Sequence, residues 1–263
     1  MDRTLEAAEF LAGLRARKEM VDDLDPDLKP ADLAQAYAVQ AALVEKLTAA
    51  RGCRVKGYKV ACTNPLAQAQ LHVPGPVFGR LLSDLIFDSP AALPAENYTR
   101  LIIEPEFGFL MAEGAPAQDG PYTPDSISER IEALLPAIEI VDHRFKDWSL
   151  VGGIGLAADN AYNGGWVKGE PYPGDWRELD LAAQEVTLTS SRGQTLHGSG
   201  AAVLGHPLNV MAWLANELNS QGLQLEKGQL VTTGVTTDIL VLEAGQSARA
   251  EFGPVGGVEV SFT

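Results

Sequence analysis

The sequence predicts an α+β protein in which helices come first and a β-rich body follows. Apolar residues recur at near-helical spacing from Leu5 to Leu14 and again from Ala31 to Ala49, where only Gln40 interrupts the stripe. From Arg54 onward the sequence changes to short runs rich in Val, Ile and Phe, separated by Gly and Pro. Because these runs do not alternate regularly with helices, we expect a mixed β-rich body with flanking helices.

In chain order, the expected elements define one helical region and one body. Asp and Pro residues between Asp23 and Pro30 separate the first two helices. A later helix is expected over Pro207 to Ser220, because Pro207 suits a first turn and Gly222 stands where a helix often ends. We expect a helical region over residues 1–52 and one continuous body over residues 53–263. The expected strands are 54–62, 100–112, 136–142, 184–190, 229–233, 238–242 and 257–262.

Composition and charge exclude several classes of function. The 263 residues include 20 Lys and Arg against 35 Asp and Glu, and the formal net charge of -15 repels the phosphate backbone of nucleic acids. Cys53 and Cys62 form neither a metal-type pair nor a disulfide framework. The first residues lack a signal-peptide pattern, and no apolar run approaches the roughly 20 residues that span a bilayer. We expect a cytoplasmic protein without nucleic-acid or membrane partners.

Common catalytic motifs are weak or missing. The segment Gly153–Ala158 partly matches a dinucleotide-binding fingerprint, but it lacks a preceding long apolar strand and a βαβ setting. The four histidines are scattered without the spacing of a zinc helix, and no G-x-S-x-G elbow occurs. The sequence therefore predicts neither a dinucleotide enzyme, nor a zinc site, nor a serine hydrolase.

Three carboxylates stand in apolar strand settings. Glu104 and Glu106 are two residues apart in one expected strand, so they share a face, while Pro105 requires an edge or a locally unpaired position. Glu139 lies in a second apolar run, 136–142. Carboxylates that converge in this way need a shared proton, a basic partner or a hard cation such as Mg²⁺ or Mn²⁺. The alternative is a solvated strand face with Glu139 paired to an arginine.

A lysine in the strand before these acids is a candidate proton carrier. Lys59 shares its strand face with Val55, Gly57 and Ala61, which are small or apolar. Partial desolvation there lowers the pKa of a lysine and makes it usable in proton transfer. Lys56, on the opposite face, is the competing candidate, and an ordinary surface lysine is the alternative.

An ordered series of segments resembles the 2-keto-4-pentenoate hydratases of the fumarylacetoacetate hydrolase superfamily. Each segment alone is weakly specific, but the order over about residues 54–262 is specific. Ala61, His143, Tyr162, Thr236 and Thr237 depart from the residues usual in that family. These departures leave the three carboxylates intact and affect the expected identity of the substrate. The matching segments are Gly57–Asn64, Ile103–Phe109, Glu139–Trp148, Asp159–Ala161, Gly205–Asn216, Lys227–Gly234 and Phe252–Gly256.

The resemblance implies a fold, a metal and roles for particular residues. It implies a fumarylacetoacetate hydrolase-like body in which Glu104, Glu106 and Glu139 hold Mg²⁺ or Mn²⁺, with no organic cofactor. It implies Lys59 as the acid/base group. It places the substrate, a small 2-oxo acid, against Thr63, Asp159, Asn160 and Tyr162.

The implied reaction adds water to a 2-hydroxy-2,4-dienoate and gives a 4-hydroxy-2-oxo acid, a step of aromatic compound catabolism. A 4-oxalocrotonate-type decarboxylase is the alternative, but the segments 59–66, 104–110 and 157–165 contain no Arg or second Lys to meet a second carboxylate. An acylpyruvate C–C hydrolase is disfavoured, because no histidine precedes His72. A non-catalytic role in a complex with another pathway enzyme also stays open. The resemblance further implies a homo-oligomer.

Overall fold

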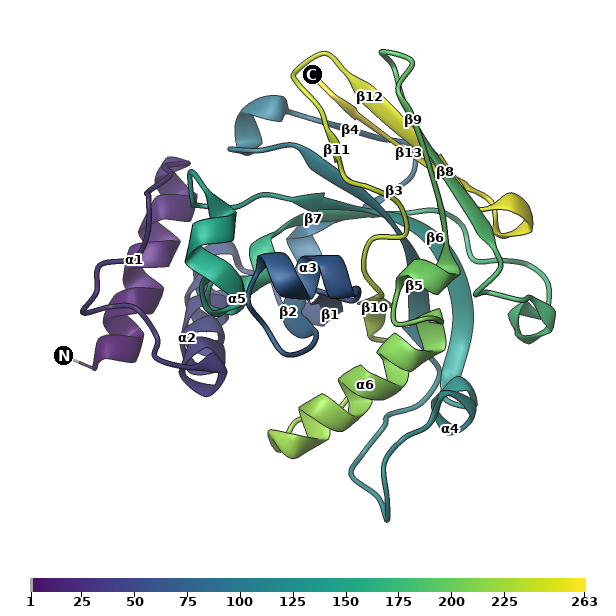
Figure 1. Cartoon of the computed structure of the whole chain (residues 1–263), viewed down its shortest axis with the longest axis horizontal. Coiled ribbons are helices and arrows are strands. Elements are labelled where there is room, and N and C mark those ends of the chain that lie inside the picture. The colour runs from purple at the N-terminus through teal and green to yellow at the C-terminus, as the bar shows by residue number, and fades with distance from the viewer. Residues whose placement is uncertain (1) are drawn as a thin grey trace.

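A computed structural model describes residues 2–263, and Figure 1 shows helices placed around two sheets. The helices are α1 (Arg3–Arg17), α2 (Leu33–Arg51), α3 (Pro65–Gln70), α4 (Pro124–Ser128), α5 (Trp148–Ala158) and α6 (Pro207–Ser220). The strands are β1 (Val55–Ala61), β2 (Val77–Leu82), β3 (Ile86–Asp88), β4 (Ala91–Leu93), β5 (Ile102–Met111), β6 (Ile131–Val141), β7 (Asn163–Lys168), β8 (Glu185–Ser190), β9 (Thr195–Ser199), β10 (Leu230–Thr232), β11 (Leu240–Val241), β12 (Ser247–Glu251) and β13 (Gly257–Phe262). A short 3-10 element, η3 (Asn160–Tyr162), joins α5 to β7.

Both sheets are mixed, which confirms the α+β prediction. The larger sheet has eight strands in the order β2-β1-β10-β5-β6-β7-β3, with β11 paired to β5 outside this path. The smaller sheet has five strands in the order β4-β13-β12-β8-β9. Pairs such as β1/β10 and β13/β4 are parallel, while β5/β6 and β12/β13 are antiparallel. The seven strands expected from the sequence all lie in these sheets.

The two N-terminal helices have clear local signals. Asp2 accepts a hydrogen bond from the amide of Thr4 at the start of α1, and Asp32 accepts one from Gln35 at the start of α2. α2 ends at Gly52, whose φ of 65° is left-handed and favours glycine. Figure 1 shows both helices on one side of the molecule, near α5. None of the described helices is long and apolar enough to cross a membrane.

Gln40 interrupts the apolar stripe of α2 because it bonds to buried backbone. Its amide nitrogen donates to the carbonyls of Phe78 at 2.9 Å and Ala157 at 2.7 Å, and its oxygen accepts from Arg80 at 2.6 Å. The side chain is fully buried, so these bonds supply the partners that water would otherwise provide. Leu11 of α1 and Leu43 of α2 belong to the same hydrophobic core as residues of the sheets.

Pro105 does not lie at the edge of a sheet, which was one of the two positions expected for it. β5 lies in the interior of the larger sheet rather than at its edge. On one side Pro105 is paired with Ile138 of β6. On the other side its carbonyl accepts from the amide of Thr236, in the gap between β10 and β11. A proline is tolerated there because the regular ladder is interrupted, so the expected local break is present without an edge.

Candidate metal centre and active site

Glu104, Glu106 and Glu139 converge on one point between β5 and β6. Glu104 stands directly opposite Glu139 in the antiparallel register, and Glu106 lies two residues further along the same face of β5. One oxygen of each carboxylate lies within 4.8 Å of the corresponding oxygens of the other two. The solvated strand face that the sequence left open is wrong for this cluster, since Glu106 and Glu139 are fully buried.

Each buried carboxylate is oriented by hydrogen bonds to one of its oxygens. Glu106 Oε2 accepts from the hydroxyl of Thr232 and, at 2.8 Å, from the amide of Gly234. Glu139 Oε1 accepts from Asn163 at 3.5 Å. Sequence reasoning missed these three anchors. The Thr232–Gly234 stretch directly after a strand was the available signal, because a turn there presents a hydroxyl and an amide together.

The opposite oxygens fit a divalent cation. Within residues 2–263, Glu106 Oε1 is buried without a hydrogen-bond partner, and Glu139 Oε2 has only an ion pair with Lys59. Burial, together with repulsion from Glu139, raises the pKa of Glu104 to about 7 despite the nearby lysine. Burial also raises the pKa of Glu106 and of Glu139. Three carboxylates facing one ammonium leave an excess of negative charge that a hard cation would balance.

Lys59 is the lysine that β1 directs into this cluster. Its Nζ lies 3.1 Å from Glu139 Oε2 and donates to the carbonyl of Ala161 at 2.9 Å. Burial lowers the pKa of Lys59, but the three neighbouring carboxylates outweigh burial and leave that pKa raised. The expectation of a lowered pKa is therefore wrong, because the sequence did not show how many acids surround the amine. Lys56 is half-buried and is not among the described residues that line the adjoining cavity.

A cavity of about 380 Å³ opens beside this centre. Lys59 and Glu104 line one part of it, and apolar side chains such as Ile102, Val141 and Leu156 line much of the rest. Among the lining residues in the described range, Lys59 is the only Lys or Arg. Residues 234–235 and 237–239 also line the cavity, so Thr237, one of the departures from the family pattern, lies at it. The cavity therefore has charged residues, Lys59 and Glu104, in one part and mostly apolar side chains around the rest.

Comparisons with known proteins agree with this geometry. The chain is 31% identical to a 2-keto-4-pentenoate hydratase of Paraburkholderia phymatum over 263 residues, which cover 100% of this chain and 98% of the relative. It is 30% identical over 232 residues to a 4-oxalocrotonate decarboxylase of a Pseudomonas species, covering 85% of this chain and 86% of that one. No family model matches the chain.

The 2-keto-4-pentenoate hydratase family therefore includes this chain. Its fold is similar to that of the 4-oxalocrotonate decarboxylase of Pseudomonas putida G7, solved with magnesium and adipate, at a TM-score of 0.91 and 25% identity over 100% of this chain and 98% of that one. The fold is also similar, at a TM-score of 0.58 and 14% identity, to a fumarylacetoacetate hydrolase family protein of Yersinia pestis, which matches 78% of this chain and 92% of its own. The second likeness concerns the fold alone.

The other candidate substrate residues of this hydratase-family chain fall into two groups. Thr63 and Tyr162 line the cavity, as does His143, whose ring centroid lies 5.7 Å from that of Tyr162. Burial lowers the pKa of His143, so it adds no cation to the wall near neutral pH. Asp159 and Asn160 are not among the described lining residues.

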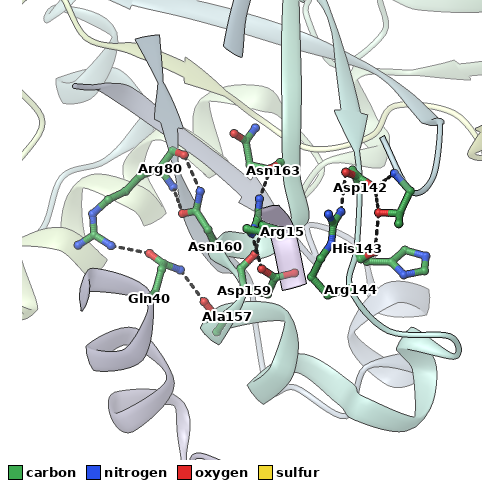
Figure 2. A network of polar contacts seen from close by, with 11 residues as sticks. Arg15, Gln40, Arg80, Asp142, His143, Arg144, Ala157, Asp159, Asn160 and Asn163 are labelled. Atoms are coloured by element: carbon green, nitrogen blue, oxygen red, sulfur yellow. Dashed lines mark hydrogen bonds and ion pairs between the residues drawn. The ribbon is translucent and has the colours of Figure 1, made fainter. Parts of the chain in front are cut away.

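Asp159 and Asn160 bond to other parts of the protein instead (Figure 2). Asp159 Oδ1 accepts from Arg15 Nε at 2.6 Å, and both side chains are buried. The amide of Asn160 accepts from the backbone nitrogen of Arg80 at 2.7 Å and donates to its carbonyl at 2.9 Å. These contacts hold α1, β2 and η3 together. In this structure both side chains contact other parts of the protein, and their predicted role in substrate binding stays a prediction.

η3 has an unusual backbone beside the active site. Asn160, Ala161 and Tyr162 have φ values of 51°, 47° and 57°, which are left-handed and uncommon for residues other than glycine. Each such residue costs on the order of 1–3 kcal/mol and persists only where its surroundings fix it. The turn passes so close to β2 that a Cβ on Gly79 would lie 2.6 Å from the Asn160 carbonyl oxygen. Gly79 is the cross-strand partner of Lys59.

Proposed function

We propose that this chain is a metal-dependent hydratase that adds water to a 2-hydroxy-2,4-dienoate and forms a 4-hydroxy-2-oxo acid. The observation that carries the proposal is the buried cluster of Glu104, Glu106, Glu139 and Lys59 at one end of an apolar cavity. The similarity to hydratases over the whole chain supports it. The magnesium reported for the Pseudomonas putida decarboxylase supports a divalent cation in the same family.

The three carboxylates would hold Mg²⁺ or Mn²⁺ through Glu104, Glu106 Oε1 and Glu139 Oε2, the oxygen that also pairs with Lys59. When bound, such a cation supplies positive charge to the carboxylate and 2-oxygen of a 2-oxo acid. The hydrogen bonds from Thr232 and Gly234 keep Glu106 turned toward the centre, which fixes its free oxygen before binding.

Lys59 would carry the proton between oxygen and carbon. Its Nζ lies 3.1 Å from Glu139 Oε2 and donates to the Ala161 carbonyl at 2.9 Å, which places an amine beside the proposed metal centre, where it can give and take a proton. Protonating C5 of the dienol, while the 2-hydroxyl gives its proton back to the amine, converts it to the isomeric conjugated 2-oxo-3-enoate. Water then adds with its oxygen on C4, and a proton completes C3, so that one water molecule is consumed and nothing is released. The hydrocarbon part of the substrate would lie against the apolar side chains of Ile102, Val141 and Leu156.

The cavity favours a monocarboxylate over a diacid. A decarboxylase acting on 4-oxalocrotonate has to accept a second carboxylate, and an unpaired buried carboxylate is costly. The described lining offers no second Lys or Arg to pair with that carboxylate. Asp238, an exposed residue of the lining, is an acid and would repel it. Among the described lining residues, His143 is the only histidine that could serve as a base in an acylpyruvate hydrolase. The hydratase reaction therefore fits these side chains best.

The test supplies 2-hydroxypenta-2,4-dienoate and 4-oxalocrotonate separately to the Mg²⁺-loaded protein. We expect loss of dienoate absorbance with formation of the 4-hydroxy-2-oxo acid, and little CO₂ from the diacid. Release of CO₂ from 4-oxalocrotonate without hydration of the dienoate would overturn the proposal in favour of decarboxylation. Absence of both reactions, with bound Mg²⁺, would favour a partner role in a complex with another enzyme. Measuring the mass of the protein in solution tests the expected homo-oligomer.

A further inference from the structure

The carbonyl that orients Lys59 belongs to the left-handed turn η3. Lys59 Nζ has two described partners, the carboxylate of Glu139 and the backbone oxygen of Ala161. The carboxylate is part of the proposed metal centre, so the Ala161 carbonyl is the contact that directs the amine independently of the acids. Its direction depends on three consecutive left-handed residues, a conformation that the local sequence does not favour. Something outside the turn has to fix it.

Arg15, at the end of α1, bonds to both ends of that turn (Figure 2). Its Nε and Nη2 donate to the side chain and the carbonyl of Asp159 at 2.6 and 2.8 Å, just before the turn. Its Nη1 donates to the carbonyl of Asn163 at 3.0 Å, just after the turn. The planar guanidinium therefore spans residues 159–163 as a rigid fork, which a lysine ammonium cannot reproduce.

The location of Arg15 separates positioning from direct catalysis. Its side chain is only 7% exposed, and Arg15 is not among the described residues that line the cavity. It lies 144 residues from Asp159 in sequence, so the contact joins the N-terminal helical region to the body. Asn160 provides a second anchor through its two bonds to the backbone of Arg80 on β2, the strand that pairs with β1.

We propose that Arg15 is a positioning residue for Lys59: it clamps η3 at both ends and so holds the Ala161 carbonyl against the lysine. The N-terminal helix α1 is thereby part of the catalytic arrangement and not only a cover for the core. This inference rests on the proposed acid/base role of Lys59. It requires that loosening the clamp lowers the rate of the chemical step while the carboxylate cluster on β5 and β6 still binds its cation.

The main test compares Arg15→Lys with Arg17→Lys, the same substitution two residues along the same helix. Arg17 is exposed and pairs with Glu19, so this control leaves the turn untouched. With 2-hydroxypenta-2,4-dienoate and Mg²⁺, we expect Arg15→Lys to lower kcat about 10- to 100-fold, because small misplacement of a reacting group costs about that much. We expect KM and Mg²⁺ affinity to change less than about threefold. The control should match the wild type.

A second variant and a structural measurement cover the case in which Arg15→Lys folds poorly. Asn160→Gly removes the anchor to Arg80 while making a left-handed backbone easier at that position. We expect a lowered kcat, and crystal structures of either variant with the Ala161 oxygen no longer about 2.9 Å from Lys59 Nζ. Wild-type kcat in folded Arg15→Lys, or an unmoved carbonyl in both variants, overturns the inference. If the wild-type protein is inactive on the dienoate, the proposed function is overturned instead. The crystal structures of the variants then still test whether Arg15 holds η3 in place.

Discussion

Two buried polar regions near Lys59 differ in charge balance: we call the acid cluster that Lys59 enters the region in front of it, and the ion pairs Asp159–Arg15 and Asp142–Arg144 the region behind it. In front, three carboxylates on β5 and β6 face a single ammonium. Behind, Asp159 pairs with Arg15, and Asp142 pairs with Arg144 at 2.5 Å, so each acid has one cation (Figure 2). The balanced region is typical of structural support, whereas the excess of acids in front indicates a place for a ligand of positive charge. Burial alone does not distinguish the two regions.

The hydrogen bonds alone do not separate the two regions. Asp142 Oδ1 accepts from the backbone nitrogens of Thr99 and Arg100 at 2.9 and 2.8 Å, and from the hydroxyl of Thr99. Within the described chain, however, Asp159 Oδ2 is buried without a hydrogen-bond partner, as is Glu106 Oε1. The excess of acids over cations is therefore the feature that distinguishes the region in front of Lys59. The following predictions test this difference, beginning with the largest effect.

Glu106→Gln should have the largest effect on turnover. The amide keeps the shape of the side chain but loses a negative ligand, and charge stabilisation by a bound cation is worth several kcal/mol, or about a thousandfold in rate. We expect loss of tight Mg²⁺ or Mn²⁺ binding by calorimetry and loss of activity on 2-hydroxypenta-2,4-dienoate. Glu113→Gln is the control, because Glu113 is 72% exposed and pairs only with Arg130. Unchanged cation affinity in Glu106→Gln would remove this residue from the metal site.

Lys59→Met should separate the proton carrier from the cation site. The thioether side chain fills the space of the lysine stem without an amine, so we expect kcat to fall roughly a hundredfold. Cation binding should persist, because removing the ammonium leaves the carboxylates more negative. Lys56→Met serves as the control, since Lys56 lies outside the cavity lining. A large loss of turnover in Lys56→Met, with near-native turnover in Lys59→Met, would show that Lys56 and not Lys59 carries the proton.

The region in front of Lys59 could be predicted from sequence because its determinants are local. Glu104 and Glu106 are two residues apart, and strand alternation alone puts them on one face. Long apolar strands such as β5 and β6, and the capped helix α6, were predicted for the same reason. Six of the described strands were not predicted. β3 and β4 are three residues long and too short for a periodic pattern to appear, whereas β2, β7, β9 and β12 have five or six residues and were missed despite their length.

The region behind Lys59 could not be predicted, because its contacts join distant residues. Nothing near Arg15 indicates that it meets Asp159, and the left-handed turn contains no glycine that would signal it. Asp159 and Asn160 were named only through the family resemblance, as residues that contact the substrate, and that role stays a prediction. Only the three-dimensional contacts place them with Arg15 and Arg80.

Gly79→Ala should perturb the region behind Lys59 without touching a charge. The new Cβ would lie 2.6 Å from the Asn160 carbonyl oxygen and 2.9 Å from the Ala161 Cβ, so η3 has to move away from β2. We expect kcat to fall about tenfold with unchanged Mg²⁺ affinity, because the Ala161 carbonyl shifts from Lys59. Gly75→Ala, which meets no atom within 4 Å, is the matched control. Equal losses in both variants would show a general sensitivity of this segment.

The smallest effect concerns stability against pH in the metal-free protein. Burial raises the folded-state pKa of Glu104 from 4.5 to about 7, and it raises those of Glu106 and Glu139 as well. The folded state therefore binds more protons than the unfolded state, and its stability declines as the pH rises from 4.5 through about 7. The raised pKa of Lys59 acts above 10.5, outside this range.

Thermal unfolding in chelator at pH 5.5, 6.25 and 7.0 should thus show a falling Tm. Excess Mg²⁺ should reverse the trend, because a cation binds the deprotonated carboxylates and stabilises the folded state more as the pH rises. The balanced pairs Asp159–Arg15 and Asp142–Arg144 are present in both conditions, so the difference between the two Tm profiles belongs to the region in front of Lys59. Two parallel profiles would mean that the three acids are neutralised by some means other than a cation.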